Sequence, residues 1–351
     1  MAKICVTGTT SWGITLAIVM ARRNHSTFLL TRNEGETEKF RHRGIESKQL
    51  PGIVLPPEIQ ITASPAEALR HSTAVIIAVP SSTMRVNIKR LAPYLAPNRL
   101  IISASKGLEM GSNKRMSQVI EDEINPRFHS NICALSGPNL ALEIARGMPA
   151  TAVVANADEP VVERAQRLLK APGFNVYTNH DIIGVEMGGT LKNIIAMGAG
   201  IIEGLGYGDN AKAAFITRGL TEMSAFAMTM GANPLTLSGL SGLGDVIATC
   251  SSSLSRNHFV GKELSKGRTL SEITAGMSGI AEGITTTAAV WDAAHKLKLE
   301  MPITRGLYQV LYKGADARAV LPDILGSSPR HELSGRRWKF SSFFKLAKWR
   351  K

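Results

Sequence analysis

The sequence predicts a doubly wound, mostly parallel α/β sheet followed by an all-α domain. In the first half of the chain, short apolar runs alternate with helical patterns, which is typical of a parallel sheet covered on both faces. From Ile182 onward the chain is rich in Ala, Gly, Met and Leu at helical spacing, without a convincing strand. The 351 residues suffice for two ordinary domains, and 44% of them are hydrophobic. We expect domains at 1–180 and 181–328, followed by a basic, aromatic tail at 329–351.

Each apolar run has the length of a buried strand and is bounded by turn-forming residues. The predicted strands are Lys3–Thr7, Phe28–Thr31, Ile59–Thr62, Val75–Val79, Leu100–Ser103, Ile132–Leu135, Thr151–Ala155 and Phe174–Thr178. The segments between them repeat apolar residues at helical spacing. The predicted helices are Ile14–Arg22, Glu34–Arg43, Ala66–Arg70, Met84–Leu91, Lys114–Ile124 and Glu159–Leu169.

The composition indicates a protein of the reducing cytoplasm. Its three cysteines (Cys5, Cys133 and Cys250) form no C-x-x-C pair, which argues against a disulfide scaffold and a thiolate zinc site. No uncharged apolar stretch reaches the roughly 18 residues of a spanning helix. Met-Ala-Lys runs directly into a predicted strand and not into a signal peptide. We expect no metal cofactor, since no cluster of His, Cys and Asp has the spacing of metal ligands.

The formal net charge of +13 is concentrated at the C-terminus. Residues 328–351 hold eight Lys and Arg against one acid, Glu332, and so contribute +7. The rest of the chain carries +6, a modest charge that suits an anionic substrate. We therefore expect a small anionic partner and no nucleic acid.

A glycine-rich loop follows the first strand and reads Gly8-Thr9-Thr10-Ser11-Trp12-Gly13. It fits the G-x-G-x-x-G fingerprint of dinucleotide-binding folds, except that Thr10 replaces the glycine that lets the backbone approach the pyrophosphate. We expect the Cβ of Thr10 to push the phosphates outward or to change the path of the loop. A plain strand-to-helix turn is the alternative, but the position at the start of a β-α-β unit favours dinucleotide binding.

Cofactor choice depends on the end of the second strand. The chain reads Leu30-Thr31-Arg32-Asn33 there, without the Asp or Glu that would accept hydrogen bonds from the ribose hydroxyls of NAD. Arg32 favours a 2′-phosphate, so we expect NADPH to be preferred, with NADH as the alternative. A solvated surface arginine is an equally good interpretation.

Two further loops follow strand ends at the same edge of the sheet. The first is Ser105-Lys106-Gly107-Leu108-Glu109, where the lysine would face the cleft. The second, Ser136-Gly137-Pro138-Asn139-Leu140-Ala141, leads into a helix whose N–H groups can hold an anion. Each loop by itself is also compatible with ordinary loop chemistry.

An unusual stretch opens the helical domain and reads Glu186-Met-Gly-Gly-Thr-Leu-Lys192-Asn193. Gly188 and Gly189 each cost about 1 kcal/mol of helix stability relative to Ala, which indicates close approach of another backbone or of a ligand. A solvated helix face explains Lys192 poorly, because the surrounding stretch is apolar. A partly desolvated lysine near other cations can exchange a proton near neutral pH.

Two polar segments follow further along the helical domain. Asp245, at the end of Ser241-Gly-Leu-Gly-Asp245, is suited either to orient Lys192 or to accept from a substrate hydroxyl. Arg256 offers a fork for a phosphate, and Ser255 and Asn257 offer neutral hydrogen bonds. A capped helix with a surface arginine is the alternative.

Together, these motifs resemble the bacterial-type NAD(P)-dependent glycerol-3-phosphate dehydrogenase family. The resemblance rests on an ordered set of stretches: Gly8 with Ser11-Trp12-Gly13, Ser105–Glu109, Gly137-Pro138, Ala145–Gly147, Gly188–Asn193, Gly242–Asp245, Leu254–Asn257 and Glu282-Gly283. It implies a Rossmann-like domain joined to a helical domain. It also implies reduction of dihydroxyacetone phosphate to sn-glycerol 3-phosphate for glycerophospholipid synthesis, with a homodimer as the default assembly.

The resemblance also implies roles for individual residues. Lys192 matches the family's proton-transfer lysine. The implied substrate-binding residues are Lys106, Gly137, Asn139, Lys192, Asp245, Ser255, Arg256 and Asn257. The implied dinucleotide-binding residues are Ser11, Trp12, Arg32, Lys106, Ala141, Arg256, Ile280 and Glu282. Asn139 stands where the family usually has Ser or Thr, and it too can form hydrogen bonds.

The tail from Trp338 to Lys351 combines basic and aromatic residues, outside the family pattern. As a helix it would align Phe340, Phe343, Phe344 and Ala347 in one apolar stripe, the pattern of an interfacial helix on anionic lipid. The expected location is therefore cytoplasmic, with peripheral membrane contact through the tail. A solvated tail, or one packed on its own subunit, is the alternative.

Two other functions stay open on the sequence alone. One is a related two-domain β-hydroxyacid dehydrogenase, against which the Ser-Arg-Asn segment argues because it favours a phosphorylated substrate. The other is a catalytically inactive NADP-binding regulator, which Thr10 alone supports and which the presence of Lys106, Lys192 and Asp245 argues against.

Overall fold

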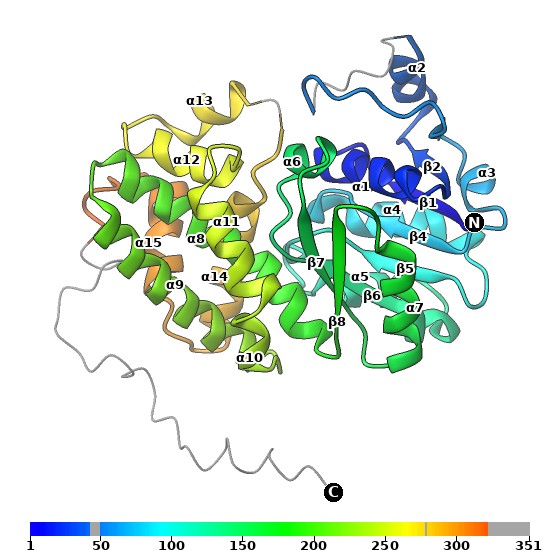
Figure 1. Cartoon of the computed structure of the whole chain (residues 1–351). Helices are drawn as coiled ribbons and strands as arrows, with labels where there is room; N and C mark the ends of the chain where they lie inside the picture. Colours follow the sequence, from blue (N-terminus) through cyan, green and yellow to red (C-terminus); the bar gives the residue numbers. More distant parts are fainter. Residues whose placement is uncertain (43–49, 278, 322–351) are drawn as a thin grey trace, which may run out of the picture.

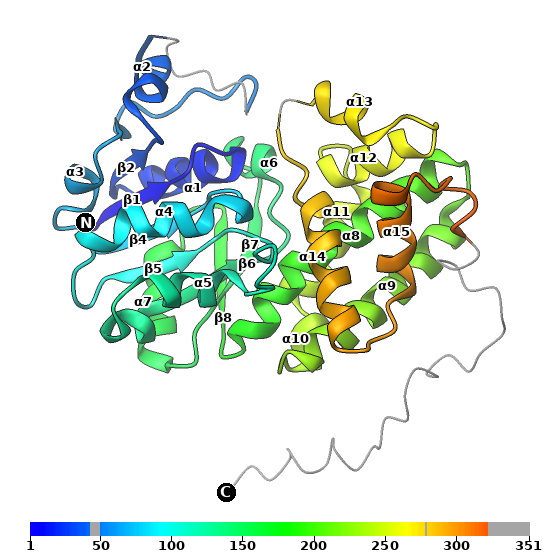
Figure 2. The ribbon, with the colours of Figure 1, turned by 180° about the vertical axis from the view of Figure 1, so that it is seen from behind.

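The computed structural model describes residues 1–42, 50–277 and 279–321. An eight-stranded sheet forms the N-terminal domain and a group of helices forms the C-terminal domain (Figures 1 and 2). The strand order is β3-β2-β1-β4-β5-β6-β7-β8, in which β6 and β7 are antiparallel and the other neighbours are parallel. The predicted fold class is confirmed.

The boundaries of the elements are close to those predicted. The strands are β1 (Lys3–Thr7), β2 (Ser26–Leu30), β3 (Gln60–Thr62), β4 (Ala74–Ile77), β5 (Leu100–Ser103), β6 (Ile132–Ser136), β7 (Ala150–Ala155) and β8 (Phe174–Asn179). The helices of the sheet domain are α1 (Ser11–Arg22), α2 (Glu34–His42), α3 (Pro65–Leu69), α4 (Met84–Leu91), α5 (Met116–Glu123), α6 (Ala141–Ala145) and α7 (Glu159–Leu169). The helical domain contains α8 (Ile182–Gly204), α9 (Asp209–Thr229), α10 (Pro234–Leu237), α11 (Asp245–Ser251), α12 (Arg256–Leu264), α13 (Leu270–Ala275), α14 (Glu282–Lys296) and α15 (Pro302–Lys313).

The predicted domain boundary between residues 180 and 181 falls in the short connection from β8 to α8, and it stays a prediction. The predicted tail at 329–351, with its apolar stripe, lies outside the described residues. In the ranges that are described, no helix is long and apolar enough to cross a membrane.

Three predicted helices begin at other residues than expected, and for α3 the difference is one residue, Pro65 in place of Ala66. α1 begins at Ser11, ahead of the predicted Ile14, because the Thr10 side chain accepts the Gly13 N–H at 3.1 Å and caps the helix. α5 begins at Met116 and not at Lys114, because Arg115 keeps an extended backbone at the N-cap position.

The sheet is buried on both faces, as a doubly wound fold requires. Ile4 and Val6 of β1 pack into the core formed with α1 and α7, whereas Cys5 packs into the opposite core formed with α4 and α5. This alternation follows from the two-residue period of a strand. The loops at the carboxyl ends of the strands are left to form the site.

Helix α8 is the centre of the helical domain, and every residue from Gly184 to Ile202 is buried. A Cβ at Gly200 would collide with the His258 carbonyl of α12, and a Cβ at Gly261 would collide with the Met197 carbonyl of α8. The glycines therefore let the backbones of α8 and α12 approach closely. Side chains on α8 are consequently held in a tightly packed layer.

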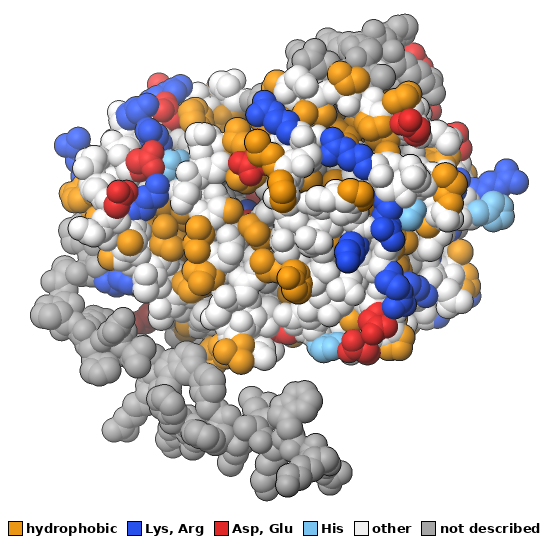
Figure 3. Space-filling view, viewed as in Figure 1, with side chains coloured by type: hydrophobic (Ala, Val, Ile, Leu, Met, Phe, Trp, Pro, Cys, Tyr) orange, Lys and Arg blue, Asp and Glu red, His pale blue; other side chains and the backbone are white. Residues whose placement is uncertain are grey.

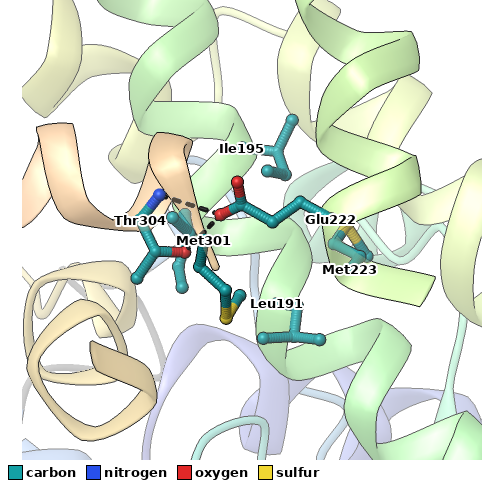
Figure 4. A pocket seen from close by; sticks show the side chains of 7 residues that line it. Leu191, Ile195, Glu222, Met223, Met301 and Thr304 are labelled. Atoms are coloured by element: carbon teal, nitrogen blue, oxygen red, sulfur yellow. Dashed lines mark hydrogen bonds between the residues drawn. The ribbon is translucent and has the colours of Figure 1, made fainter. Parts of the chain in front are cut away.

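A buried carboxylate joins α15 to α9. Glu222 accepts hydrogen bonds from the backbone N–H groups of Ile303 and Thr304, both at 2.9 Å, and from Thr304 Oγ1 at 2.7 Å. Figure 4 shows the bonds to Thr304. Burial raises the pKa of the Glu222 carboxyl, and these hydrogen bonds offset only part of that effect. The surrounding pocket is otherwise lined mainly by apolar side chains, namely Leu191, Ile194, Ile195, Met223 and Met301.

Charged side chains on the surface are spread over both domains. On the face shown in Figure 3, Lys and Arg side chains lie between small groups of hydrophobic and acidic ones. The exposed large hydrophobic residues include Val54, Val86, Tyr177, Leu235 and Ile280, which come from both domains. Scattered exposure of this kind is normal for a protein surface.

The variant Glu222→Gln is expected to lower the free energy of unfolding by about 1–3 kcal/mol, because an amide has one acceptor oxygen and leaves a buried N–H unsatisfied. Urea unfolding measures the change. Glu300→Gln, at an exposed glutamate just before α15, is the control and should stay within about 0.5 kcal/mol of wild type. A midpoint for Glu222→Gln equal to that of the control would refute the role of this carboxylate.

Candidate active site

The site forms where the carboxyl edge of the sheet meets α8. A Cβ at Gly189 would collide with Ser136 Oγ at the end of β6 and would lie 3.3 Å from Lys106 Cδ. A Cβ at Gly188 would lie 2.6 Å from the Ser241 carbonyl oxygen. The close approach predicted at Gly188 and Gly189 is therefore confirmed, and it brings the two domains into contact beside Lys192.

One carboxylate bridges two lysines in this contact. Lys192 Nζ donates to Asp245 Oδ1 at 2.7 Å, and Lys106 Nζ donates to Asp245 Oδ2 at 2.5 Å. The side chain of Asp245 is 1% exposed, and those of Lys192 and Lys106 are 11% and 15% exposed. Two ammonium groups thus share one carboxylate, which leaves an excess positive charge in a nearly water-free place.

Each lysine keeps one N–H for a ligand. Lys192 Nζ also donates to Thr249 Oγ1 at 2.7 Å, and Lys106 Nζ also donates to the Gly137 carbonyl at 3.1 Å. Within the described part of the chain, these contacts and the bonds to Asp245 use two of the three N–H groups of each ammonium. The remaining N–H groups suit an oxygen atom held between the two lysines.

The pKa of the Lys106 ammonium is lower than that of an ordinary lysine. Burial lowers the pKa of Lys106, Asp245 raises it and the nearby Lys192 charge lowers it, with a net value of about 8. A lysine in water has a value near 10.5. Lys106 therefore loses its charge within a pH range that enzymes experience.

A chain of amides lies next to Lys192 on α8. Asn257 Nδ2 donates to Asn193 Oδ1 at 2.9 Å, and Asn257 Oδ1 accepts the Gly283 N–H at 2.9 Å. Asn257 was predicted as a substrate-binding residue, and the structure directs its amide toward other protein groups. The Asn193 side chain is therefore held by Asn257 through its amide oxygen.

Arg256 and Ser255 begin α12 at the edge of the same region. Arg256 is exposed, and its Nη1 donates to the Ile280 carbonyl at 2.9 Å. Ser255 is buried and caps α12 by accepting the His258 N–H at 3.2 Å. The structure therefore joins Arg256 to Ile280, two residues predicted at the dinucleotide site.

Glu282 links the helical domain to the sheet. Its carboxylate accepts from Ser81 Oγ at 2.6 Å and from the Ser81 backbone N–H at 3.4 Å. Burial raises the pKa of Glu282, although the Ser81 bonds act in the opposite direction. Ser81 follows β4, and the residue after that strand, Ala78, also contacts the glycine-rich loop, so this bond joins the two domains near the loop.

The glycine-rich loop is a tight turn that packs closely against the end of β4. A Cβ at Gly8, whose φ is +108°, would lie 2.6 Å from the Ala78 carbonyl oxygen, and a Cβ at Gly13 would collide with the Gly8 carbonyl. Thr10 Oγ1 donates to Ala78 at 2.7 Å while it caps α1. The side chain of Thr10 is thus bonded to the end of β4, and the α1 N-terminus still faces the loop.

The other predicted dinucleotide residues surround this loop. Ser11 and Trp12 open α1, and the Trp12 indole Nε1 is buried without a partner among the described residues. Thr15 of α1 donates to the Ala141 carbonyl at 3.0 Å, which fixes α6 beside α1. Arg32 follows β2 and is 77% exposed, with an ion pair to Glu36 at 2.9 Å.

The end of β6 and the loop that follows it contribute two oxygen atoms without a partner among the described residues. Ser136 Oγ and Asn139 Oδ1 are buried and have no hydrogen-bond partner within the described residues. Asn139 Nδ2 donates to the Thr151 carbonyl at 3.3 Å. A polar ligand between this loop and Lys106 would satisfy such atoms.

Sequence reasoning missed several residues of the site. Thr249 is a small polar residue in an apolar segment, which carries no separate signal, and Ser136 was within a recognised motif but was given no role of its own. Ser81 and Glu36 lie in polar stretches that resemble solvated surface. Asn193 was within a recognised motif, but its contact with Asn257 spans 64 positions and depends on the fold.

Comparison with known proteins identifies the family. The chain matches the family model for the N-terminus of NAD-dependent glycerol-3-phosphate dehydrogenase over residues 3–162, and the corresponding C-terminal model over residues 181–322. The chain belongs to the NAD-dependent glycerol-3-phosphate dehydrogenase family. The predicted resemblance is confirmed, and with it the predicted class of enzyme, an NAD(P)-dependent oxidoreductase that acts on a CH–OH group.

Individual relatives cover nearly the whole chain. A glycerol-3-phosphate dehydrogenase [NAD(P)+] of Dehalococcoides mccartyi is 52% identical over 352 residues, which cover 100% of this chain and 98% of the relative. One of Desulfitobacterium hafniense is 42% identical, with 95% and 94% covered. The crystal structure of the glycerol-3-phosphate dehydrogenase of Coxiella burnetii is 32% identical, with a TM-score of 0.87 over 93% of this chain and 99% of that one.

A glycerol-3-phosphate dehydrogenase uses a nicotinamide cofactor, and the loop geometry fits one. The described residues contain no group of three or more His, Cys, Asp and Glu that could hold a metal ion. The residues predicted for substrate and cofactor stay predictions, since the comparisons do not test individual positions.

The variant Gly189→Ala is expected to lower activity by about tenfold or more, because the new methyl group displaces Ser136 and Lys106 in a close-packed interior. Steady-state rates and thermal unfolding measure the effect. Gly208→Ala is the matched control, since a Cβ at Gly208 meets nothing within 4 Å. Wild-type rates in a folded Gly189→Ala variant would show that the contact does not position Lys106.

Proposed function

We propose that the chain reduces dihydroxyacetone phosphate to sn-glycerol 3-phosphate with Lys192 as the proton-transfer residue. The observation that carries this proposal is the carboxylate of Asp245, which holds the ammonium groups of Lys192 and Lys106 at 2.7 and 2.5 Å. Both groups face the same buried region at the carboxyl edge of the sheet. When bound, the nicotinamide supplies the hydride that the substrate carbon receives.

Lys192 holds the proton that the substrate oxygen takes up. Its N–H groups toward Asp245 and Thr249 fix the direction of the third N–H. As negative charge develops on the carbonyl oxygen, this N–H donates to it and then transfers its proton. In the reverse direction the neutral amine of Lys192 accepts the proton from the alcohol.

Lys106 supplies positive charge next to the same oxygen. Its ammonium attracts the anionic substrate and stabilises the developing charge, since attraction is stronger in a place with little water. The bond to the Gly137 carbonyl keeps Lys106 at the mouth of the loop after β6. Asn193 offers a further N–H to the substrate from the adjacent position on α8.

The substrate phosphate lies toward Arg256 in this proposal. The guanidinium stands at the start of α12, where it offers a fork of donors together with N–H groups of the helix end. A phosphate held there orients the ketone toward Lys192, which lowers the entropic cost of reaction. Ser255 and Asn257 hold α12 and Asn193 in the required position.

The dinucleotide lies along the first loop of the sheet. Gly8 and Gly13 allow the tight turn and the close packing that bring the α1 N-terminus to this loop, and Ser11 and Trp12 offer donors there. Arg32 is suited to a 2′-phosphate, which supports use of NADPH, and NADH binds at the same place. The unpartnered Trp12 indole N–H supports a ligand at this loop.

The product would be a precursor of glycerophospholipids, as the family resemblance implies. A cytoplasmic location and a homodimer also remain predictions. Contact with anionic membranes depends on the tail outside the described residues.

The variant Lys192→Ala is expected to lower kcat by about 10²–10⁴-fold, because it removes the group that transfers the proton. KM changes less, since Arg256 and Lys106 still attract the substrate. Lys212→Ala is the control, because Lys212 pairs with Glu203 on the far part of α8. Near-wild-type turnover by the purified, folded Lys192→Ala variant would exclude the proton-transfer role.

The KM for dihydroxyacetone phosphate is expected to rise as the pH increases through about 8, where Lys106 loses its proton. The rise comes from the loss of one positive charge that faces an anionic substrate. In Asp245→Asn the rise should occur at lower pH, because the carboxylate raises the pKa of Lys106. A pH profile of KM for both proteins measures this, and identical profiles would contradict it.

A further inference from the structure

Glu36 on α2 is a carboxylate fixed between the glycine-rich loop and the end of β2. It accepts from Thr9 Oγ1 at 2.8 Å, from the Arg32 backbone N–H at 2.9 Å and from Arg32 Nη2 at 2.9 Å. The Glu36 side chain is 14% exposed, whereas that of Arg32 is 77% exposed. The Glu36 carboxylate is therefore mostly buried and fixed by its neighbours, whereas the Arg32 guanidinium extends into solvent.

This place corresponds to the adenosine ribose of a bound dinucleotide. In dinucleotide-binding folds the pyrophosphate lies at the glycine-rich loop, and the ribose lies beyond it near the end of the second strand. Strands β1 and β2 are parallel neighbours, and the Gly8 N–H donates to the Leu30 carbonyl at 3.3 Å. Glu36 contacts the glycine-rich loop through Thr9 and the segment after β2 through Arg32.

An acid at the end of the second strand accepts from the ribose 2′-hydroxyl in NAD-binding proteins. This chain has Arg32 near that strand end, but the fold returns Glu36 from the next helix to the same region. The Glu36 backbone N–H donates to Asn33 Oδ1 at 2.9 Å, which fixes the start of α2. Glu36, four residues after Arg32, therefore supplies the acid that is missing at the end of β2.

Resting on the proposed function, we propose that Glu36 determines cofactor specificity together with Arg32. Its carboxylate accepts from the 2′-hydroxyl of the adenosine ribose in NADH and repels the 2′-phosphate of NADPH. Arg32 attracts that phosphate, but the guanidinium must first break its ion pair with Glu36. The two side chains oppose each other, so the enzyme uses both nucleotides and discriminates weakly between them.

The charge state of Glu36 agrees with this role. Burial alone would raise the pKa of Glu36, but hydrogen bonds from Arg32 and Thr9 outweigh it and hold the pKa below its usual value. The carboxylate is thus ionised at neutral pH. An ionised carboxylate is a strong acceptor for a hydroxyl and an unfavourable neighbour for a phosphate.

The competing interpretation is an i,i+4 surface ion pair without contact to a ligand. Three probes that lack nicotinamide separate the two, because they differ only at the 2′ position and undergo no turnover: ADP-ribose, 2′-deoxy-ADP-ribose and 2′-phospho-ADP-ribose. Calorimetric titration of the full chain gives a Kd for each. For wild type we expect 2′-deoxy-ADP-ribose to bind about tenfold more weakly than ADP-ribose, a typical effect of losing a hydrogen bond to a charged group.

In Glu36→Gln, 2′-phospho-ADP-ribose should bind about tenfold more tightly than it binds wild type, because a repulsive charge is removed and Arg32 is released. The difference between ADP-ribose and its deoxy analogue should shrink to about twofold. The ratio of kcat/KM for NADPH and NADH should shift in the same direction. Glu34→Gln removes the same charge from an exposed position on the same helix and should keep the wild-type ratios.

Equal affinity of wild type for ADP-ribose and the deoxy probe would overturn the proposal without any variant. Unchanged ratios in a folded Glu36→Gln variant, or the same shift in Glu34→Gln, would overturn it as well. If wild type binds none of the three probes, the dinucleotide site and the proposed function fail together. If it binds ADP-ribose but the 2′ preferences do not depend on Glu36, only this inference fails.

Discussion

The arrangement of the site depends on one buried carboxylate that satisfies two ammonium groups. Asp245 is almost fully buried, so bulk water cannot solvate its carboxylate, and the two lysines supply its counter-charges. Lys106 comes from the loop after β5, whereas Lys192 and Asp245 come from the helical domain. The ion pair between Lys106 and Asp245 therefore also holds the two domains together at the site.

Close approach of backbones makes this pairing geometrically feasible. Without side chains at Gly188 and Gly189, α8 reaches the ends of β5 and β6, and Lys192 one turn later faces Asp245. Other contacts across the cleft act in the same direction, since Glu282 binds Ser81 and Arg115 forms an ion pair with Glu186 at 2.5 Å. The two ammonium groups that share one carboxylate leave a net positive charge, which suits a small anion that gains negative charge during reaction.

The spacing of apolar residues predicted most strands and helices, because each of these elements depends on interactions between residues that are close in the sequence. The strands of the sheet were recognisable from apolar runs, and the start of α1 was displaced only because a side-chain cap from Thr10 is not part of the apolar pattern. Lys192 was recognisable because a lysine in an apolar helix, close to two glycines, lowers the stability of the fold unless its charge has a partner or a function. Thr249 carried no such signal, since a threonine in an apolar helix is common, and its importance comes from contact with a lysine 57 positions away.

The amino-acid sequence by itself determined the alternation of strands and helices, the glycine-rich loop and the family, because each depends on residue type at short spacing. Only the tertiary structure decided which charges meet. Glu34, Glu36 and Glu38 look alike in the sequence, yet the turn from β2 into α2 brings Glu36 to Thr9 and Arg32. Pairing of charges across long stretches of chain depends on distances of a few ångström, and these exist only after the backbone has folded.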